Sequence, residues 1–292
     1  MSDIRTALKQ AMIRLREAQV PSHTLAAELL LMHAAQRDRT WLYSHADEPL
    51  DAATCADYLT LIEKRASGVP TQYLTGRQEF WGLEFHVAPG VLIPRPETEH
   101  LIEVALERLG RQQPGRIADA GTGSGCLAVT LAREFPIAEV RATDISKTAL
   151  AIAQGNAERH GVAGRIRFVE GNLLEPFLAA SSHARRVPFH LIVSNPPYVG
   201  RREAESLPRE VREHEPPEAL FSGEEGCELY PALIEQARAL LAPGGLLVLE
   251  LGHASLPRVH PLLHNQAWHD VRVTDDLAGI PRVISAFRSG SI

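Results

Sequence analysis

Cysteine is scarce in this chain of 292 residues. The three cysteines, Cys55, Cys126 and Cys227, lie far apart and form no C-x-x-C pair, so neither a disulfide framework nor a zinc site is indicated. His260 and His264 have helical i, i+4 spacing, but no Glu follows His260 and a proline intervenes, which disfavours a metal pair. We therefore expect no bound metal, and we interpret Cys126 as a small buried helix residue.

Long apolar runs, a leader pattern and an excess of positive charge are also missing. Runs such as Leu246–Leu249 are far shorter than the ~20 residues that a membrane span needs, and the first residues show no signal-peptide pattern. The 30 basic and 36 acidic residues give a net charge of −6 without a strongly basic stretch, which disfavours direct binding of nucleic acid. We expect a cytoplasmic enzyme with no membrane partner.

What the chain does contain is the segment Asn195-Pro-Pro-Tyr198, directly after an apolar run, Phe189–Ser194, that is typical of a buried strand. Two prolines fix φ at about −65° and remove two backbone donors, so the carbonyls are left to accept hydrogen bonds from a ligand. Asn195 adds a side-chain acceptor and Tyr198 an aromatic face. This rim suits a planar substrate that carries an NH2 group. The alternative is an ordinary Pro-Pro turn at the end of a strand.

A second pattern lies upstream, where Gly121-Thr-Gly-Ser-Gly125 joins an expected strand, Arg116–Ala120, to an expected helix, Cys126–Glu134. Strand, glycine turn and helix in this order are typical of a nucleotide-binding site. Glycines permit positive φ and close approach of the backbone to a ligand, and unpaired N–H groups at the start of the helix can bind a carboxylate or a phosphate. The third glycine of the dinucleotide fingerprint is absent, which disfavours NAD.

A second expected strand, Glu139–Asp144, ends in an acid about 20 residues beyond the glycines, the separation at which a carboxylate binds ribose hydroxyls. We predict Asp144 as the ribose ligand. The alternative is that Asp144 only caps the helix that opens at Ser146.

The first 70 residues favour helices. Apolar residues recur at i, i+3, i+4 and i+7 in the first helix, which is expected to stop near Pro21: Ile4, Ala7, Leu8, Ala11, Met12 and Leu15. Ser22 is expected to cap a second helix through Gln36, and helical patterning returns from Thr54 to Arg65. Phe80, Leu83, Phe85 and Val87 then sit amid polar residues and glycine turns, which predicts a hairpin.

From residue 97 helices alternate with strands expected near 116–120, 139–144, 165–170, 189–194 and 246–251, which predicts a mostly parallel, doubly wound sheet. Two last strand-like runs, 270–274 and 282–287, fit an antiparallel hairpin at one edge. The segment from Arg201 to Pro217 is charged and weakly periodic, so it is either a mobile cover over the substrate or a solvated loop.

The order of these motifs resembles the amino-methyltransferases that use S-adenosyl-L-methionine (SAM). More narrowly, the chain from about residue 70 onward resembles the PrmC/HemK family, the peptide chain release factor N5-glutamine methyltransferases. The resemblance is carried by Gln72–Gly76, Phe80–Phe85, Val91–Glu99, Asp119–Gly125, Thr143–Ser146, Gly171–Leu174, Ser194–Tyr198, Glu215–Leu220, Pro243–Gly245 and Leu249–Gly252.

This resemblance implies a doubly wound, seven-stranded class I SAM-dependent methyltransferase (Rossmann-like) domain, preceded by a small helical domain and a β-hairpin linker. We expect the helical substrate-binding domain at 1–75, the linker at 76–96 and the methyltransferase domain at 97–292. The implied reaction transfers a methyl group from SAM to the side-chain nitrogen (N5) of the glutamine in the Gly-Gly-Gln motif of class 1 release factors. The other product is S-adenosyl-L-homocysteine.

Residue roles follow from the motifs and the resemblance together. The Asn195 side-chain oxygen and the Pro196 carbonyl are expected to accept one N–H each from the substrate amide, beside Pro197. Tyr198 either packs over the amide or fixes the loop, and Asp119 either orients the glycine loop or accepts from the ammonium group of SAM. The remaining expected SAM contacts are Gly121, Thr122, Gly123, Ser124, Gly125, Asp144 and Asn195, with Asn172 and Leu173 near the adenine by resemblance alone.

Two other functions compete with this interpretation. Enzymes that methylate the exocyclic amino group of adenine or guanine also use Asn-Pro-Pro-Tyr, although the acidic balance disfavours a nucleic-acid substrate here. A scaffold that binds SAM or a release factor without transferring a methyl group is the second alternative, and the complete set of glycine, acid and Asn-Pro-Pro-Tyr motifs disfavours it.

Overall fold

The computed structural model describes residues 3–179 and 187–290. Within them the chain forms two compact units. The first comprises residues 3–77 together with Leu207–His214, and the second comprises residues 78–206 and 215–290 outside the gap. Each unit has a hydrophobic core of its own.

The first unit is helical, as the apolar periodicity predicted. Its helices are α1 (Ile4–Glu17), α2 (His23–Ala35), α3 (Arg39–Ser44), α4 (Ala52–Ala66), α5 (Thr71–Thr75) and, from later in the chain, α10 (Arg209–His214). The core between α1, α2 and α4 includes Leu15, Leu30 and Ile62. Tyr58 is fully buried there and donates a hydrogen bond of 3.0 Å to the Ala27 carbonyl, so its polar atom is satisfied inside the core.

The cap predicted at Ser22 is wrong, and so is one of the two interpretations of segment 201–217, of which residues 207–214 belong to this unit. Ser22 has a left-handed backbone (φ 50°) and makes no side-chain cap, because an N-cap residue needs an extended backbone for its oxygen to reach the first turn. Of the two interpretations of segment 201–217, the solvated loop is wrong, because the segment forms η4 (Arg201–Ser206), α10 and the start of α11 (Pro217–Leu220). The mobile cover over the substrate stays a prediction. An ion pair between buried Arg65 and Glu210 holds α10 in the helical unit, and local periodicity cannot reveal such a distant contact.

The predicted hairpin, β1 (Arg77–Phe80) and β2 (Leu83–His86), begins at Arg77 of the first unit and otherwise belongs to the second unit. Trp81 and Gly82 form its turn, both with positive φ (54° and 68°), which is the backbone of the tight turns that match the twist of paired strands. The domain boundaries at 75/76 and 96/97 stay a prediction.

A seven-stranded sheet forms the centre of the second unit, with the order β5-β4-β3-β6-β7-β9-β8. All the neighbouring pairs from β5 to β7 are parallel, and β9 is antiparallel to both β7 and β8. This confirms the predicted doubly wound sheet with an antiparallel edge. The strands are β3 (Arg116–Ala120), β4 (Glu139–Asp144), β5 (Ile166–Glu170), β6 (Phe189–Ser194), β7 (Leu241–Glu250), β8 (Trp268–Asp275) and β9 (Pro281–Arg288).

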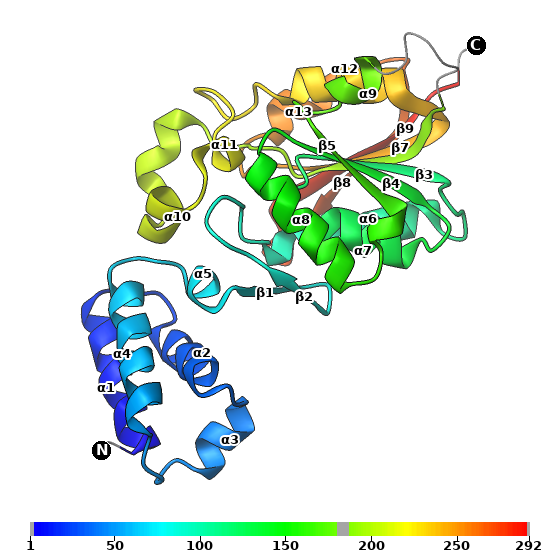
Figure 1. Cartoon of the computed structure of the whole chain (residues 1–292). Coiled ribbons are helices and arrows are strands. Elements are labelled where there is room, and N and C mark those ends of the chain that lie inside the picture. The colour runs from blue at the N-terminus through cyan, green and yellow to red at the C-terminus, as the bar shows by residue number, and fades with distance from the viewer. Residues whose placement is uncertain (1–2, 180–186, 291–292) are drawn as a thin grey trace. The chain divides into compact units, whose positions relative to one another are not determined.

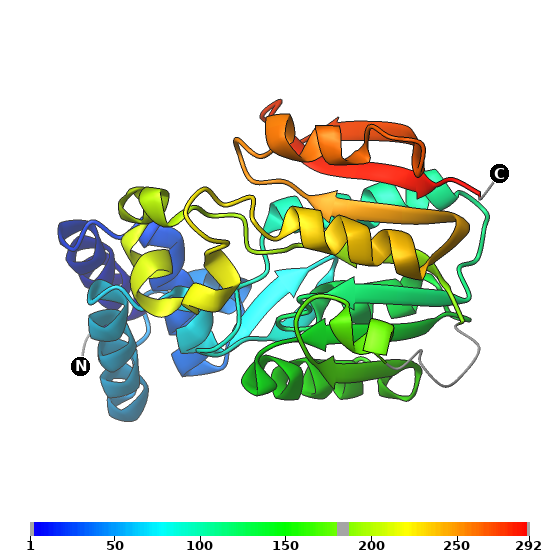
Figure 2. The ribbon, with the colours of Figure 1, turned by 90° about the horizontal axis from the view of Figure 1, so that it is seen from above.

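Helices cover both faces of the sheet. Figure 1 shows α6 (Glu99–Leu109), α7 (Cys126–Glu134) and α8 (Lys147–Arg159) on one face, and α9 (Glu175–Ala179), α12 (Tyr230–Leu240) and α13 (Leu256–Leu263) on the other. Short 3-10 turns, η1 (Pro96–Thr98) and η2 (Ala163–Arg165), precede α6 and β5. Two buried clusters, one for each face, fill the space between helices and sheet. Figure 2 views the same sheet from above, with β8 and β9 at the edge opposite β5.

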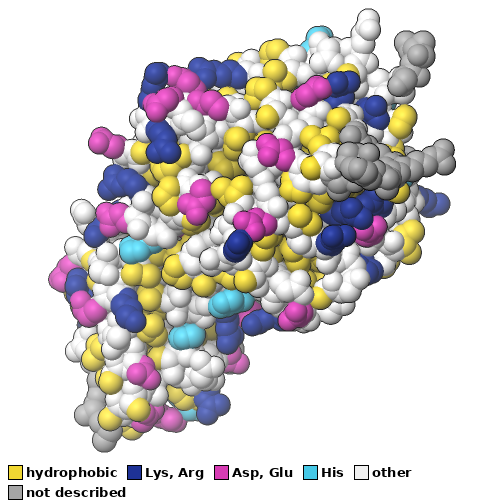
Figure 3. All heavy atoms as spheres, turned by 45° about the horizontal axis from the view of Figure 1, so that its top comes forward, with side chains coloured by type: hydrophobic (Ala, Val, Ile, Leu, Met, Phe, Trp, Pro, Cys, Tyr) yellow, Lys and Arg dark blue, Asp and Glu magenta, His cyan; other side chains and the backbone are white. Residues whose placement is uncertain are grey.

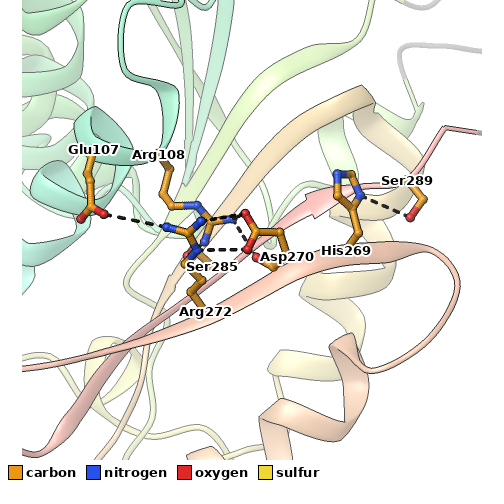
Figure 4. Close-up of polar contacts among 7 residues, drawn as sticks. All are labelled: Glu107, Arg108, His269, Asp270, Arg272, Ser285 and Ser289. Atoms are coloured by element: carbon orange, nitrogen blue, oxygen red, sulfur yellow. Dashed lines mark hydrogen bonds and ion pairs between the residues drawn. The ribbon is translucent and has the colours of Figure 1, made fainter.

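The antiparallel edge is attached to α6 through one buried arginine (Figure 4). Arg108 donates to Ser285 Oγ at 2.8 Å and to the Asp270 carbonyl at 2.7 Å, and its guanidinium lies 4.7 Å from the centre of the Phe287 ring. Burial lowers the pKa of Arg108, and the nearby Asp270 carboxylate acts against that effect. These contacts fix the last two strands to the helix layer on that face.

Candidate functional site

The predicted motifs meet at the carboxyl ends of three neighbouring strands. In the sheet β3 lies between β4 and β6, with Ala120 opposite Thr143 on one side and Ser194 on the other. The residues that follow these ends are therefore brought together, and they are Gly121, Asp144 and Asn195. Strand order reverses at β3, and in open α/β sheets ligands bind at such a switch point.

A pocket opens at this place in the second unit. Of the predicted residues, Gly121, Thr122, Gly123, Ser124, Asp144, Asn172, Leu173, Asn195 and Pro197 line it. Four other predicted residues, Asp119, Gly125, Pro196 and Tyr198, are not among the residues that line it.

The glycine loop has the positive φ values that its composition predicted. Gly121, Gly123 and Gly125 have φ of 74°, 55° and 82°. A Cβ on Gly125 would lie 2.9 Å from the Ala153 Cβ of α8, so this glycine permits close packing of the loop on the helix. A Cβ on Gly121 would lie 3.9 Å from the Asn195 carbonyl oxygen, which shows how near the loop and the Asn-Pro-Pro-Tyr segment are.

The N–H groups of four residues in the glycine loop, which precedes the helix start, are paired within the protein. The N–H groups of Gly121 and Thr122 donate to the Thr143 carbonyl at 2.9 and 2.8 Å, and that of Gly125 donates to the Thr122 carbonyl at 2.8 Å. Gly123 N–H donates to Asp144 Oδ2 at 2.9 Å. The end of β4, through the Thr143 carbonyl and the Asp144 carboxylate, thus accepts from three of these four donors.

Asp144 is partly buried at the pocket wall, and each of its carboxylate oxygens accepts one backbone N–H: Oδ2 from Gly123, and Oδ1 from Ser146 at 2.9 Å. Burial raises its pKa, while these hydrogen bonds act in the opposite direction. The cap of α8 is Ser146, whose hydroxyl accepts from Ala149 N at 3.2 Å. A carboxylate has about four lone-pair sites, so Asp144 keeps acceptor capacity toward the pocket.

Asp119 lies at the end of β3, fully buried behind the glycine loop. Its Oδ2 accepts from the Thr122 hydroxyl at 2.6 Å, and its Oδ1 is buried without a hydrogen-bond partner among the described residues. Burial raises the pKa of Asp119 to about 7. The contact with Thr122 supports the alternative in which Asp119 orients the loop.

Asn195 projects from the end of β6 into the pocket lining, and its amide is held from one side. Its Nδ2 donates to Thr98 Oγ1 at 3.0 Å, and Thr98 Oγ1 donates to Glu250 Oε2 at 2.7 Å. No described residue is hydrogen-bonded to Asn195 Oδ1. The segment therefore presents a side-chain acceptor beside the glycine loop, on a stiff Pro-Pro backbone.

Tyr198 contacts the same glutamate from the other side. Its hydroxyl donates to Glu250 Oε1 at 3.1 Å, and a Cβ on Gly252 would come within 3.2 Å of its side chain. Burial and the neighbouring Glu250 carboxylate raise the pKa of Tyr198. Because Tyr198 does not line the pocket, this geometry supports the alternative in which Tyr198 fixes the loop.

Sequence reasoning missed one wall of the pocket, which is formed by two segments of the second unit. After the hairpin, the wall contains Gly90, Val91, Leu92, Pro94, Arg95 and Thr98, and later in the chain it contains Pro216, Glu218, Ala219 and Leu229. Arg95 is ion-paired with buried Glu215, which also accepts from Ile93 N at 3.2 Å. The signal was available in Val91–Glu99 and Glu215–Leu220, which carried the resemblance but received no site role.

Buried Asn156 of α8 is a second residue that was missed. Its Nδ2 donates to the carbonyls of His86 and Ser124 at 2.9 Å each, and its Oδ1 accepts from His86 N at 2.8 Å. One side chain thus connects the hairpin to the glycine loop. A mid-helix Asn gave no sign of this contact in the sequence.

No helix in the described part of the chain has the length and apolar character needed to cross a membrane. Within those residues, no group of three or more His, Cys, Asp or Glu side chains is arranged to hold a metal ion. The three cysteines are unpaired with one another, and Cys126 is buried at the start of α7 as predicted.

Comparison with known proteins now decides the family. Residues 6–76 match a family model described as the PrmC N-terminal domain, and residues 88–211 match one described as the methyltransferase small domain. A release factor glutamine methyltransferase of Koribacter versatilis (strain Ellin345) is 44% identical over 281 residues, which cover 96% of this chain and 97% of that protein. The chain belongs to the release factor glutamine methyltransferase family. Other bacterial proteins of the same name are 43–44% identical, and the resemblance seen in the motifs is confirmed.

Solved structures agree on the fold. A methyltransferase from Pyrococcus furiosus has a TM-score of 0.52 at 20% identity and covers 72% of this chain and 91% of its own. A 16S rRNA N2 G1207 methyltransferase of T. thermophilus, in complex with AdoMet and guanosine, has a TM-score of 0.51 at 22% identity. The match covers 73% of this chain and 49% of that chain. At these identities the likeness concerns the fold alone, and it confirms the predicted methyltransferase architecture.

Proposed function

We propose that this protein transfers the methyl group of SAM to the side-chain amide nitrogen (N5) of the glutamine in the Gly-Gly-Gln motif of class 1 release factors. The observation that carries the proposal is the meeting of the glycine loop with Asn195, whose Oδ1 is hydrogen-bonded to no described residue, at one pocket of the sheet. Family membership supplies the substrate class, because the relatives are named release factor glutamine methyltransferases.

The pocket residues fit SAM. Asp144 has acceptor capacity for the ribose hydroxyls, and half-exposed Ile145 beside it offers an apolar surface for a base. The positive-φ glycines let the backbone approach the methionine part closely. Asn172 and Leu173 line the same pocket, where we assign them to the adenine neighbourhood. Asp119 is fully buried outside the pocket lining and accepts from the Thr122 hydroxyl, so we assign it to holding the loop in the conformation that receives the ligand.

Positioning is the main task of the chain's own residues, because a glutamine amide nitrogen is a poor nucleophile. When bound, SAM supplies an electrophilic methyl group. Asn195 Oδ1 and the Pro196 carbonyl each accept one N–H of the amide and orient its nitrogen. Such orientation can supply about 7–11 kcal/mol of the barrier. The same two acceptors favour the positive charge that grows on nitrogen during transfer, so they stabilise the transition state more than the ground state.

The proposed partner is a class 1 release factor, with the helical unit contacting a second part of it. Because release factors act on ribosomes, the proposal places the protein in the cytoplasm, without direct binding of nucleic acid or membrane. Figure 3 shows one face of the molecule, where acidic and basic side chains are interspersed. A field of a single sign, as a nucleic-acid surface would show, is not seen on that face.

The experiment is incubation of the protein with tritiated SAM and either a class 1 release factor or duplex DNA. Label in the release factor, with one added methyl on the Gly-Gly-Gln glutamine by peptide mass spectrometry, is the expected result. A release factor in which that glutamine is replaced by Glu should take up no label. Label in DNA would support methylation of a nucleobase, and label in neither would support a scaffold; both outcomes contradict the proposal.

A further inference from the structure

Thr98 stands where a helix cap is expected, but its hydroxyl is used elsewhere. It precedes α6, it is 2% exposed, and its side chain makes no capping hydrogen bond to the helix. Thr, Ser, Asp and Asn at this position normally accept from an N–H of the first turn. In this protein the hydroxyl lies between Asn195 Nδ2 at 3.0 Å and Glu250 Oε2 at 2.7 Å.

Glu250 is fully buried at the end of β7, and both of its oxygens are engaged. Oε2 accepts from Thr98 and Oε1 from Tyr198. Its main-chain carbonyl accepts from the Tyr230 hydroxyl at 2.8 Å, and Ser194 of β6 is in register with the preceding residue, Leu249. The carboxylate is thus fixed beside the end of β6, where Asn195 begins the Asn-Pro-Pro-Tyr segment.

The chemistry of these groups sets the direction of the chain of hydrogen bonds. Burial raises the pKa of Glu250 to about 7. Above that pH Glu250 is ionised and only accepts, so Thr98 donates its single hydroxyl proton to Glu250. Toward Asn195 the Thr98 oxygen can then only accept, and it pairs with the Nδ2 end of the carboxamide. The Oδ1 end of the carboxamide then points away from Thr98. A carboxamide without such a constraint can turn by 180° about its last torsion at little cost, because that torsion is broad and roughly two-fold.

We infer that Thr98, held by Glu250, is a positioning residue that fixes the Asn195 carboxamide with its oxygen presented to the substrate amide. This inference rests on the proposed function for its catalytic consequence. With the carboxamide reversed, Nδ2 would face the N–H groups of the substrate, donor against donor, and the pocket would lose its side-chain acceptor. In this role Thr98 acts through Asn195, since its hydroxyl is hydrogen-bonded to Asn195 and Glu250.

The first test compares T98V, which has the same shape but no hydroxyl, with T98S, which restores one. T98V should lower kcat for release factor methylation about 10- to 100-fold, and its dissociation constant for SAM should stay within about twofold of wild type. T98S should recover most of the lost rate. A T98V enzyme with the kcat of wild type, or a T98S enzyme as slow as T98V, would overturn the inference.

The second test needs no ligand and no activity. In 15N-labelled wild-type protein, the side-chain NH2 of Asn195, assigned by its loss in N195S, should exchange with solvent more slowly than an exposed amide. In T98V its resonances should shift and exchange faster, and in T98S they should return. Fast exchange in the wild type would overturn the inference even if T98V fails to fold.

The two proposals fail in different ways. If the wild-type protein methylates no glutamine, the proposed function fails, while the amide spectra still decide whether Thr98 holds Asn195. If the wild type methylates glutamine and T98V does so equally fast, only the role of Thr98 fails.

Discussion

The two sides of the pocket are held by different kinds of contact. The side that we propose binds the methyl donor SAM is called the donor side. There Gly121–Gly125 and Asp144 are fixed mainly by backbone hydrogen bonds between neighbouring strand ends. The side that we propose binds the methyl-accepting glutamine is called the acceptor side. There Asn195 is fixed by side chains, through Thr98 and the buried Glu250. A site made of backbone tolerates side-chain changes that keep the loop conformation, whereas a site made of a buried side-chain network depends on each hydroxyl and carboxylate in it.

The largest effect is expected on the acceptor side. Asn195→Ala removes the side-chain acceptor and should lower kcat by about 10²–10³, which is about 2.7–4 kcal/mol, the range found when one oriented polar group of a transition state is removed. SAM binding should be retained, since the backbone of the glycine loop is unchanged. Steady-state kinetics with calorimetry of SAM binding measure both quantities. A rate within twofold of wild type would rule out the assigned role.

On the donor side, substitutions that disturb the backbone of the glycine loop should lower the unfolding free energy. Gly125→Ala places a Cβ 2.9 Å from the Ala153 Cβ at a φ of 82°, and we expect a loss of about 2–3 kcal/mol of unfolding free energy. Gly123→Ala is the matched control, because its Cβ would meet nothing within 4 Å and only the strained φ should cost about 1 kcal/mol. Urea unfolding measures the unfolding free energy of both variants. Equal losses in the two would contradict the role of Gly125 in packing against Ala153.

Removal of the carboxylate at the end of β4 should affect binding more than chemistry. Asp144→Ala should raise the dissociation constant for SAM about tenfold or more, equivalent to about 1.4 kcal/mol, and leave kcat at saturating SAM within a few-fold. Glu139→Ala at the opposite, exposed end of the same strand controls for loss of an acid. Unaltered calorimetric affinity in Asp144→Ala would refute the ribose assignment.

The last prediction concerns pH. Because burial raises the pKa of Asp119 to about 7, above its unfolded value of about 3.9, the folded protein binds the extra proton between these values. The unfolding free energy should therefore fall as pH rises from about 4 to about 7. Asp119→Asn should reduce this slope, measured as the melting temperature at pH 5.5 and 8, while Asp57→Asn, on exposed helix surface, should not. If the pH dependence of the melting temperature is unchanged in Asp119→Asn, the raised pKa of Asp119 is contradicted.

The donor side was largely predictable from the sequence, and the acceptor side was only partly so. The strands that end at Ala120, Asp144 and Ser194 are short apolar runs with clear ends, so their order placed the glycine loop and both polar residues at one edge. The pairing of the loop's N–H groups was missed because it depends on the Thr143 carbonyl of a neighbouring strand.

The network around Asn195 had no local signature. Its contacts join Asn195 to Thr98 across 97 positions and Thr98 to Glu250 across 152, and a Thr before a helix indicates a cap when only its neighbours are considered. The place of α10 in the helical unit was hidden for the same reason, since it depends on an ion pair between Arg65 and Glu210, which lie 145 positions apart. Local patterns predict elements, while side-chain contacts between distant segments need the structure.

The central claim is that a fixed carboxamide oxygen receives the substrate amide beside the glycine loop. The most direct measurement is a crystal structure of the protein with S-adenosyl-L-homocysteine and a Gly-Gly-Gln peptide. The account predicts Asn195 Oδ1 within hydrogen-bonding distance of the glutamine nitrogen, with Nδ2 still on Thr98 Oγ1. A complex in which Asn195 presents Nδ2 to the peptide, or turns away from its glutamine, would contradict it.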